Sequence, residues 1–325
     1  MLARNALAQA SLVASAMVAA CNGSSSPPAS GDGATVPPSR WMAAVGAKGT
    51  FTQTFDAVTW ATRRLSPVDL YAVACVGNLD GWAAGANGTV AHTTDGGSTW
   101  NWQETHTSAA LHTIRFGTSM AGVVAGDSGA LATTIDGGST WRPIAPLTTA
   151  TLRSSAVAAA AGVTLVVGDG GVVLRSVNGG ADWSSSVIPG SADLRGVASD
   201  PSAHLVLAVD TSGSVWSSFD AGASFVREAS AGAPLDAVAM SDDGTAAVAA
   251  GAGGTVLERS VDAGWRAVTV STAADLHAAL IMSEPGATQY VAGEAGTLLS
   301  SSDRGTTWSA VKTGAAEAFF GLDDL

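Results

Sequence analysis

The sequence is poor in charge and in the residues that usually cover exposed helices. Among 325 residues there are only 2 lysines, 6 glutamates and 4 glutamines, and charged residues make up 13% of the chain. This composition argues against a mainly helical protein. The 15 basic and 27 acidic side chains give a net charge of −12, which argues against binding nucleic acid through a basic surface.

Cysteine is also scarce, and common catalytic motifs are missing. The chain has two cysteines, Cys21 and Cys75, and neither lies in a CxxC or Cys/His cluster that would hold a metal. The sequence contains no GxSxG, HExxH, phosphate-binding loop or EF-hand spacing, so we expect no metal and no cofactor. Cys75 lies in an apolar stretch and is expected to be buried.

The N-terminus has the pattern of an export signal. Arg4 precedes an alanine-rich apolar run, residues 6–20, that is too short to span a bilayer. The run ends in Val18-Ala19-Ala20-Cys21, which resembles a bacterial lipobox; the alternative is an ordinary secretory signal beside a coincidental cysteine. The sequence therefore predicts a signal peptide (1–20), a lipidated Cys21, and a Ser/Pro/Gly tether within 21–40. We expect an exported protein, lipid-anchored in a bacterial cell envelope and facing the periplasm.

What the sequence has in abundance is a repeated phrase containing glycine and tryptophan. Its clearest copies are residues 94–100 and 135–141, which share the pattern Asp-Gly-Gly-Ser-Thr-Trp. The acidic or amide residue of the phrase recurs at Asp56, Asp95, Asp136, Asn178, Asp220, Asp262 and Asp303. A leucine recurs in step with it, at positions 70, 111, 152, 194, 235 and 276. The chain is therefore a repeat of about 41 residues.

Each repeat contains four short strand-like runs, which in the third repeat are residues 111–116, 121–126, 130–134 and 141 onward. This predicts an all-β fold, a seven-bladed β-propeller of four-stranded antiparallel blades over residues 41–325. Residues 41–50 match the second and third strands of a repeat, so the first blade lacks its inner strand. Residues 318–322 supply such a strand, and we expect this C-terminal strand to close the ring.

The repeated phrase resembles the Asp box, or BNR repeat, of propeller hairpins. A structural role follows from its chemistry, because the carboxylate accepts backbone N–H groups, glycine adopts positive φ and tryptophan covers the turn. We assign that structural role to Asp95, Trp100, Asp136, Trp141, Asn178, Trp183, Asp220, Asp303 and Trp308.

The whole repeat, over residues 41–325, resembles the seven-bladed propellers of the photosystem II stability and assembly factor family. The resemblance implies a non-enzymatic protein that holds an assembling membrane-protein subunit. We therefore expect an envelope or membrane protein as partner, with no nucleic acid, and a monomeric propeller. The alternative is a glycan-binding or sialidase-like Asp-box propeller. Sialidase chemistry needs three arginines and a Tyr–Glu pair, and the chain has only Tyr71 and Tyr290 as tyrosines.

Binding is expected on the face opposite the Asp boxes, where residue types differ between blades. The candidates in the turns between second and third strands are Lys48, Asp127, Asp169, Asp210 and Glu294. The candidates beside the repeat leucines are Tyr71, His112, Arg153, Arg195, Asp236 and His277. Arg115 should point into a channel otherwise lined by small residues. We expect no aromatic-lined cavity, and no two-histidine metal site because four or more blades separate His112 from His277 along the ring.

Overall fold

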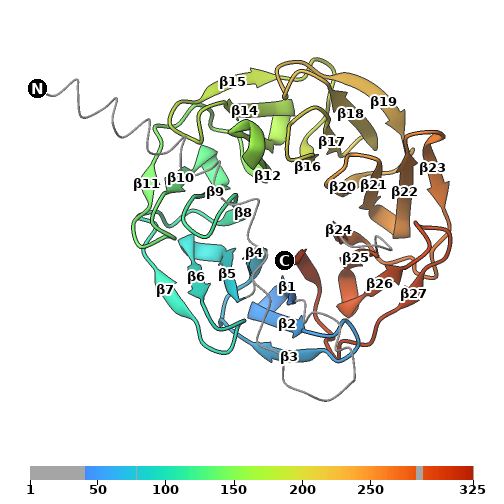
Figure 1. Cartoon of the computed structure of the whole chain (residues 1–325), viewed down its shortest axis with the longest axis horizontal. Coiled ribbons are helices and arrows are strands. Elements are labelled where there is room, and N and C mark those ends of the chain that lie inside the picture. The colour runs from blue at the N-terminus through green and yellow to red at the C-terminus, as the bar shows by residue number, and fades with distance from the viewer. Residues whose placement is uncertain (1–40, 78, 283–287, 325) are drawn as a thin grey trace, which may run out of the picture.

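The computed structural model describes residues 41–77, 79–282 and 288–324. Within these residues, 28 strands form seven four-stranded antiparallel sheets around a central axis (Figure 1). The predicted seven-bladed, all-β propeller is confirmed. The predicted signal peptide, Cys21 and the tether lie outside the described residues. Over the part of the chain that is described, no helix has the length and hydrophobicity of a membrane span.

Each blade runs from an inner strand beside the axis to an outer strand at the rim. The inner strands are β28 (Phe319–Asp324), β4 (Leu70–Val76), β8 (Leu111–Phe116), β12 (Leu152–Ala158), β16 (Leu194–Ser199), β20 (Leu235–Met240) and β24 (Leu276–Ile281). The second strands are β1 (Met42–Gly46), β5 (Asp80–Gly85), β9 (Gly122–Gly126), β13 (Val163–Gly168), β17 (Val206–Asp210), β21 (Ala246–Gly251) and β25 (Gln289–Gly293).

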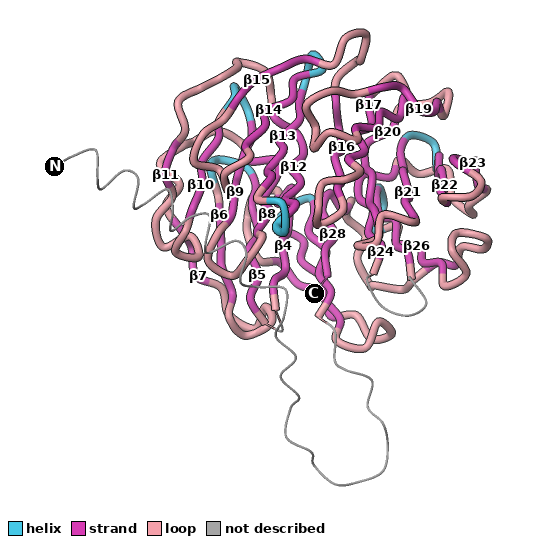
Figure 2. Tube along the Cα trace, turned by 45° about the horizontal axis from the view of Figure 1, so that its top comes forward, coloured by secondary structure: helices cyan, strands magenta, loops and turns pink. Residues whose placement is uncertain are grey.

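The third strands are β2 (Thr50–Thr54), β6 (Val90–Thr93), β10 (Leu131–Thr134), β14 (Val172–Ser176), β18 (Ser214–Ser218), β22 (Thr255–Ser260) and β26 (Leu298–Ser301). The outer strands are β3 (Ala61–Arg64), β7 (Asn101–Gln103), β11 (Arg142–Pro143), β15 (Ser184–Val187), β19 (Val226–Ser230), β23 (Gly264–Val268) and β27 (Ser309–Ala310). The tilted view in Figure 2 shows strands of neighbouring blades side by side, with loops at both ends.

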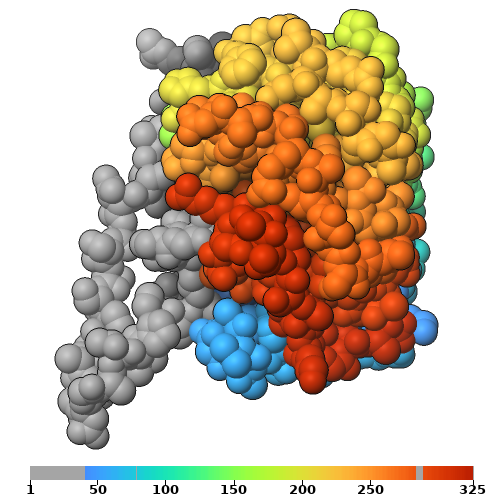
Figure 3. Space-filling view, turned by 90° about the vertical axis from the view of Figure 1, so that its right-hand side faces the viewer, coloured from blue at the N-terminus to red at the C-terminus, as the bar shows by residue number. Residues whose placement is uncertain are grey.

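The first blade takes its inner strand from the other end of the chain. β28 pairs antiparallel with β1, with Met42 opposite Asp324 and Val45 opposite Gly321. Phe319 is fully buried in the core shared by the first and last blades. Figure 3 shows the N-terminal blade in blue directly beside the C-terminal segments in red. The predicted closure of the ring by the C-terminal strand is therefore confirmed.

Short turns join the second and third strands on one face of the ring. Six of them are single 3-10 turns: η1 (Ala47–Gly49), η2 (Ala86–Gly88), η3 (Asp127–Gly129), η5 (Asp169–Gly171), η6 (Ala252–Gly254) and η7 (Glu294–Gly296). A further short helix, η4 (Ala159–Ala161), joins β12 to β13. The Gly-x-x-Gly pattern of these turns has a packing cause. A Cβ on Gly126 would lie 1.8 Å from the Ala110 carbonyl oxygen, and Gly129 has φ +74°.

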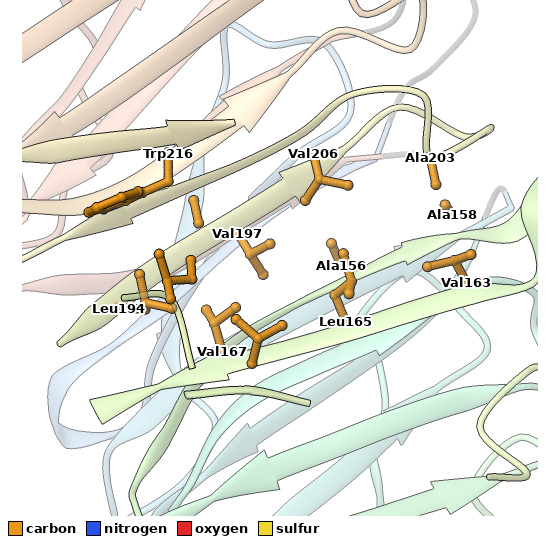
Figure 4. Close-up of a cluster of buried hydrophobic side chains, with 13 residues drawn as sticks. Ala156, Ala158, Val163, Leu165, Val167, Leu194, Val197, Ala203, Val206 and Trp216 are labelled. Carbon is orange, nitrogen blue, oxygen red and sulfur yellow. The ribbon is translucent and has the colours of Figure 1, made fainter. Parts of the chain in front are cut away.

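Small and branched apolar side chains fill the space between blades. Figure 4 shows one such cluster, in which Leu165 and Val167 of the fourth blade face Val197, Val206 and Trp216 of the fifth. The second strands are buried along almost their whole length because a neighbouring blade packs on each side of them. These contacts hold the inner strands in a fixed ring and thereby position the side chains at its mouth.

The Asp boxes lie at the hairpins between third and outer strands, on the face opposite the 3-10 turns. In the second blade, the Thr99 N–H and hydroxyl donate to the Asp95 carboxylate at 2.8 and 2.6 Å. These bonds lower the pKa of Asp95 to about 2. Asp136, Asp220 and Asp303 make the same pair of bonds at the same distances or within 0.1 Å of them.

Three boxes vary this arrangement. In the first blade, Asp56 accepts the backbone N–H groups of Val58 and Thr59 at 2.9 and 2.7 Å. In the fourth blade, Asn178 replaces the aspartate, accepts the Asp182 N–H at 2.9 Å and donates its own amide to the Asp182 carboxylate. In the sixth blade the hairpin is shorter, because Ser260 pairs directly with Gly264 and Asp262 lies in the tight turn between them. The tryptophan rings cover the turns, and Trp100 and Trp183 donate to the carbonyls of Gly97 and Gly180.

Phe319 tests how much the ring depends on its closing strand. Replacing this fully buried ring by alanine should lower the free energy of unfolding by about 3–5 kcal/mol, because it leaves a cavity where β28 meets the first and last blades. Phe219→Ala is the matched control, since Phe219 is 70% exposed at an Asp-box hairpin and should change stability by less than about 0.5 kcal/mol. Urea denaturation followed by tryptophan fluorescence measures both. Equal losses in the two variants would contradict the closure argument.

Candidate binding site at the mouth of the central channel

Seven side chains at one repeat position surround the axis on the face that carries the 3-10 turns. Each directly follows the first residue of an inner strand, and we call them the mouth ring: Tyr71, His112, Arg153, Arg195, Asp236, His277 and Phe320. Together with the next residues of the inner strands they line one cavity of about 120 Å³. The propeller therefore brings together all six candidates predicted beside the repeat leucines.

One side of the mouth ring is charged. Arg153 donates to both carboxylate oxygens of Asp169, at 2.9 and 2.8 Å. This pairing raises the pKa of Arg153. Burial alone would raise the pKa of Asp169, but the Arg153 pairing holds it below its ordinary value. Arg195 is held more loosely, with its guanidinium nitrogens 3.9 Å from carboxylate oxygens of Asp169 and Asp193.

The histidines of the mouth ring are also paired with carboxylates. His112 Nε2 lies 2.8 Å from Asp127 Oδ1. His277 lies between two acids, with Nδ1 3.2 Å from Asp236 and Nε2 3.2 Å from Glu294. The bond to Asp236 is the main cause that raises the pKa of His277 above 6.5, and Glu294 adds to it. Among the turn candidates, Asp127, Asp169 and Glu294 thus lie at the mouth as partners of its basic groups.

The other side of the mouth ring is aromatic, which corrects the expectation of no aromatic-lined cavity. The Phe320 ring centroid lies 5.9 Å from that of Tyr71 and 5.7 Å from that of His277, and Tyr71 lies 5.0 Å from His112. Phe320 was missing from the candidates because they were chosen beside leucines, and β28 begins with Phe319 at that position. The predicted closure of the ring could have indicated Phe320, because the closing strand is the seventh inner strand and must supply the seventh residue of the mouth ring.

These contacts also correct the expected separation of His112 and His277. Four steps separate their blades along the chain, but only three in the other direction around the ring, through Tyr71 and Phe320. Each histidine nitrogen in contact with an acid faces a different carboxylate. In the described part of the chain, no group of three or more His, Cys, Asp or Glu side chains is arranged to hold a metal ion.

Below the mouth, the inner wall is held by an ion pair whose acidic partner, Asp323, is buried and whose basic partner, Arg115, is partly exposed. Arg115 lines the cavity, as its position predicted, and donates to Asp323 at 2.6 Å. Asp323 also accepts the backbone N–H of Cys75 at 2.9 Å, so three inner strands meet at this carboxylate. Cys75 is buried, and burial raises the pKa of its thiol well above the usual value. The thiol is therefore protonated and unreactive at neutral pH.

Two turn candidates lie away from the mouth. Lys48 is not among the residues that line the mouth cavity, and it pairs with Glu317 at 3.0 Å. Asp210 is fully buried, so its assignment to a binding face is wrong. Its carboxylate accepts the Trp216 indole N–H and the backbone N–H groups of Ser212 and Ser214, all at 2.9 Å. The fifth blade uses Asp210 to build its turn, in place of the 3-10 turn of other blades.

The mouth can bind a ligand through both kinds of side chain. Tyr71 and Phe320 offer aromatic surface for packing, while the ion pairs on the other side can exchange partners with charged or polar groups. The Tyr71 pKa is raised by burial and by Asp69 and Asp127, so the hydroxyl remains protonated. The arrangement is thus one for recognition by contact.

The fold and the repeated hairpins define the chain as a seven-bladed propeller of the Asp-box class. Residues 98–230, from the second to the fifth blade, match the family model described as "Photosynthesis system II assembly factor YCF48". A comparison with curated proteins gives no significant match.

Solved structures show the same fold. The structure titled "YCF48 bound to D1 peptide" is 19% identical, with a TM-score of 0.61 and 88% of each chain covered. The structure titled "YCF48 from Cyanidioschyzon merolae" is 16% identical, with a TM-score of 0.59, and the match covers 77% of this chain and 86% of that one. The chain is therefore a BNR-repeat propeller similar to the photosystem II assembly factors.

His277 provides a pH-dependent test of the mouth geometry. Asp236→Asn should lower the pKa of His277, and Glu294→Gln should lower it less, as followed by NMR of the imidazole resonances. Because the folded pKa is raised, the paired imidazolium stabilises the protein below about pH 6.5 and this stabilisation is lost as pH rises through the folded pKa. The stability difference between wild type and Asp236→Asn should therefore be largest below pH 6. An unchanged His277 titration in Asp236→Asn would contradict this geometry.

Proposed function

We propose that this protein is a non-catalytic, protein-binding propeller, and that its mouth ring binds an exposed polypeptide segment of its partner. The observation that carries the proposal is the convergence of seven side chains of five residue types, from one repeat position, onto one rim. A symmetric scaffold could equally have placed seven like residues there. A similar solved propeller bears a title that names a bound D1 peptide, which supports a polypeptide ligand.

The chemistry of the mouth supports recognition over catalysis. A sialidase-like mechanism would need a tyrosine with a lowered pKa and arginines free to grip a carboxylate. Tyr71 has a raised pKa, and the Nε and Nη2 donors of Arg153 are taken up by Asp169. The alternative, a glycan-binding propeller, draws support from the aromatic surface of Tyr71 and Phe320, on which a sugar ring could stack.

The site of action is part of the proposal. A signal peptide over residues 1–20 and a lipidated Cys21 would place the propeller on the periplasmic side of a bacterial envelope membrane. The tether within 21–40 would let the mouth reach a neighbouring membrane or envelope protein. We propose that the propeller holds such a protein during its assembly, and that it does so as a monomer.

Capture of the partner tests the mouth. Wild-type protein should capture an envelope protein. Full-length protein carrying Tyr71→Ala and Phe320→Ala should recover about tenfold less of that partner, because central aromatic contacts usually contribute more than 1 kcal/mol each. Crosslinking in intact cells, followed by purification from detergent-solubilised envelopes and quantitative mass spectrometry, gives the measurement.

Phe219→Ala is the control, because it removes an exposed aromatic ring from the opposite face. A partner lost equally from both variants would speak against the mouth as the site. A glycan array probed with the same proteins distinguishes the alternative: binding that disappears only in the double variant would support glycan recognition.

Lipid attachment has a direct assay. Metabolic labelling with radioactive palmitate should label the wild-type protein and leave Cys21→Ser unlabelled, because the proposed acyl chains are attached at Cys21. The variant should also move from the membrane fraction to the soluble fraction or remain uncleaved. Cys75→Ser should keep its label. Label retained in Cys21→Ser would contradict the proposed anchor.

A further inference from the structure

The third blade contains an apolar pocket of about 350 Å³ beside the mouth. Its walls are aliphatic and come from β8, β9 and β10 and from the chain around β11: Leu111, Val124, Leu131, Pro143 and Ile144. Ala109, Ala130, Ala132 and Pro146 complete the apolar lining, and Thr105, His106, Thr107, Asp127 and Ser128 add polar groups to it. This volume lies at the lower end of the range for ligand pockets, and the lining has the apolar character of such sites. Neither the repeat pattern nor the mouth ring accounts for the pocket.

The pocket exists because the third blade departs from the repeat. In the second and seventh blades, Thr105 and Thr313 stand two residues before the carbonyl that contacts the turn glycine, and both are buried. The residue at that position in the third blade is Pro146, which is exposed. The backbone itself is alike in the third and seventh blades: β11 and β27 are both two residues long, and the Ile144 N–H donates to Leu131 at 2.9 Å as the Val311 N–H donates to Leu298 at 2.8 Å. The difference lies in the side chain: Pro146 is exposed where Thr105 and Thr313 are buried, and the space beside η3 stays open.

The pocket and the mouth are adjacent. Leu111 forms part of the pocket wall, and the next residue, His112, belongs to the mouth ring. Asp127 lines the pocket and lies 2.8 Å from His112 Nε2. The Asp127 side chain is 46% exposed and stands on the boundary between the two sites. An extended segment that occupies the mouth needs to cross only this residue to reach the pocket.

We propose that this pocket holds a large apolar side chain of the same polypeptide segment that the mouth ring binds. The inference rests on the proposed function and specifies that the bound polypeptide must contain a large apolar side chain. The largely aliphatic wall would disfavour a charged group, which would lose hydration there, and the carboxylate on the lining, Asp127, is already paired with His112. The volume suits an aromatic or long aliphatic side chain, whose burial would supply contact area that the charged side of the mouth lacks. The pocket would thus select among polypeptides by one anchoring residue.

A small probe tests the pocket alone. N-acetyl-tryptophanamide, titrated into methyl-labelled protein, should cause saturable NMR shifts of the Ile144 and Leu131 methyl groups, while N-acetyl-lysinamide should not. Ala109→Leu should fill the pocket and weaken the probe at least tenfold. Ala274→Leu is the matched control, because Ala274 holds the same repeat position and donates to a threonine hydroxyl as Ala109 does. No saturable shift, or equal binding by Ala109→Leu, would overturn the proposal.

A phage-displayed library of 12-residue peptides, selected on wild-type protein, then tests the link to the mouth. The selected peptides should share a large apolar residue and lose at least tenfold in affinity in Ala109→Leu and in the Tyr71→Ala/Phe320→Ala variant, but not in Ala274→Leu. Peptides that depend on the mouth but not on Ala109 would overturn this inference and leave the proposed function standing. A library that yields no mouth-dependent peptide would count against the proposed function, and against this inference with it.

Discussion

The pairing of β28 with β1 is the interaction on which the rest of the structure depends. Without it, the first blade would have three strands and an unpaired edge, and the last blade would have no neighbour on one side. In a ring, every blade is held by contacts on both sides, so the stability of each blade depends on closure. The mouth shares this dependence, because its seven side chains converge only when all seven inner strands surround one axis.

The closing strand β28 also contributes side chains to the candidate site and to the channel wall. β28 brings Phe320 to the mouth ring, and three residues further on it brings Asp323 to Arg115 and to the Cys75 amide. The strand that completes the fold thus also completes the aromatic side of the candidate site. The six residues of β28 therefore both close the ring and contribute to the candidate binding site, so a substitution in this strand can affect stability and the site together.

The repeat period predicted most of the fold because glycine, aspartate and leucine recur where the backbone requires them. The six mouth residues beside the leucines were predicted for the same reason. Three features were not predictable from the period. Asp210 is buried because the fifth blade builds its turn from a carboxylate. Phe320 follows a phenylalanine where other blades have leucine. The third-blade pocket lies where Pro146 is exposed at a position that holds a buried threonine in two other blades, and the sequence shows that proline but not the space left open beside it.

The distance along the chain between the two partners of the closing pair has a consequence for biosynthesis. Val45 pairs with Gly321, which is made 276 residues later. Until then β1 presents an open edge that another nascent chain could pair with, and loop closure of this length is slow. Folding of the first blade during synthesis would therefore be premature. The ring can therefore close only after the last strand has been made, whatever the order in which the other blades fold.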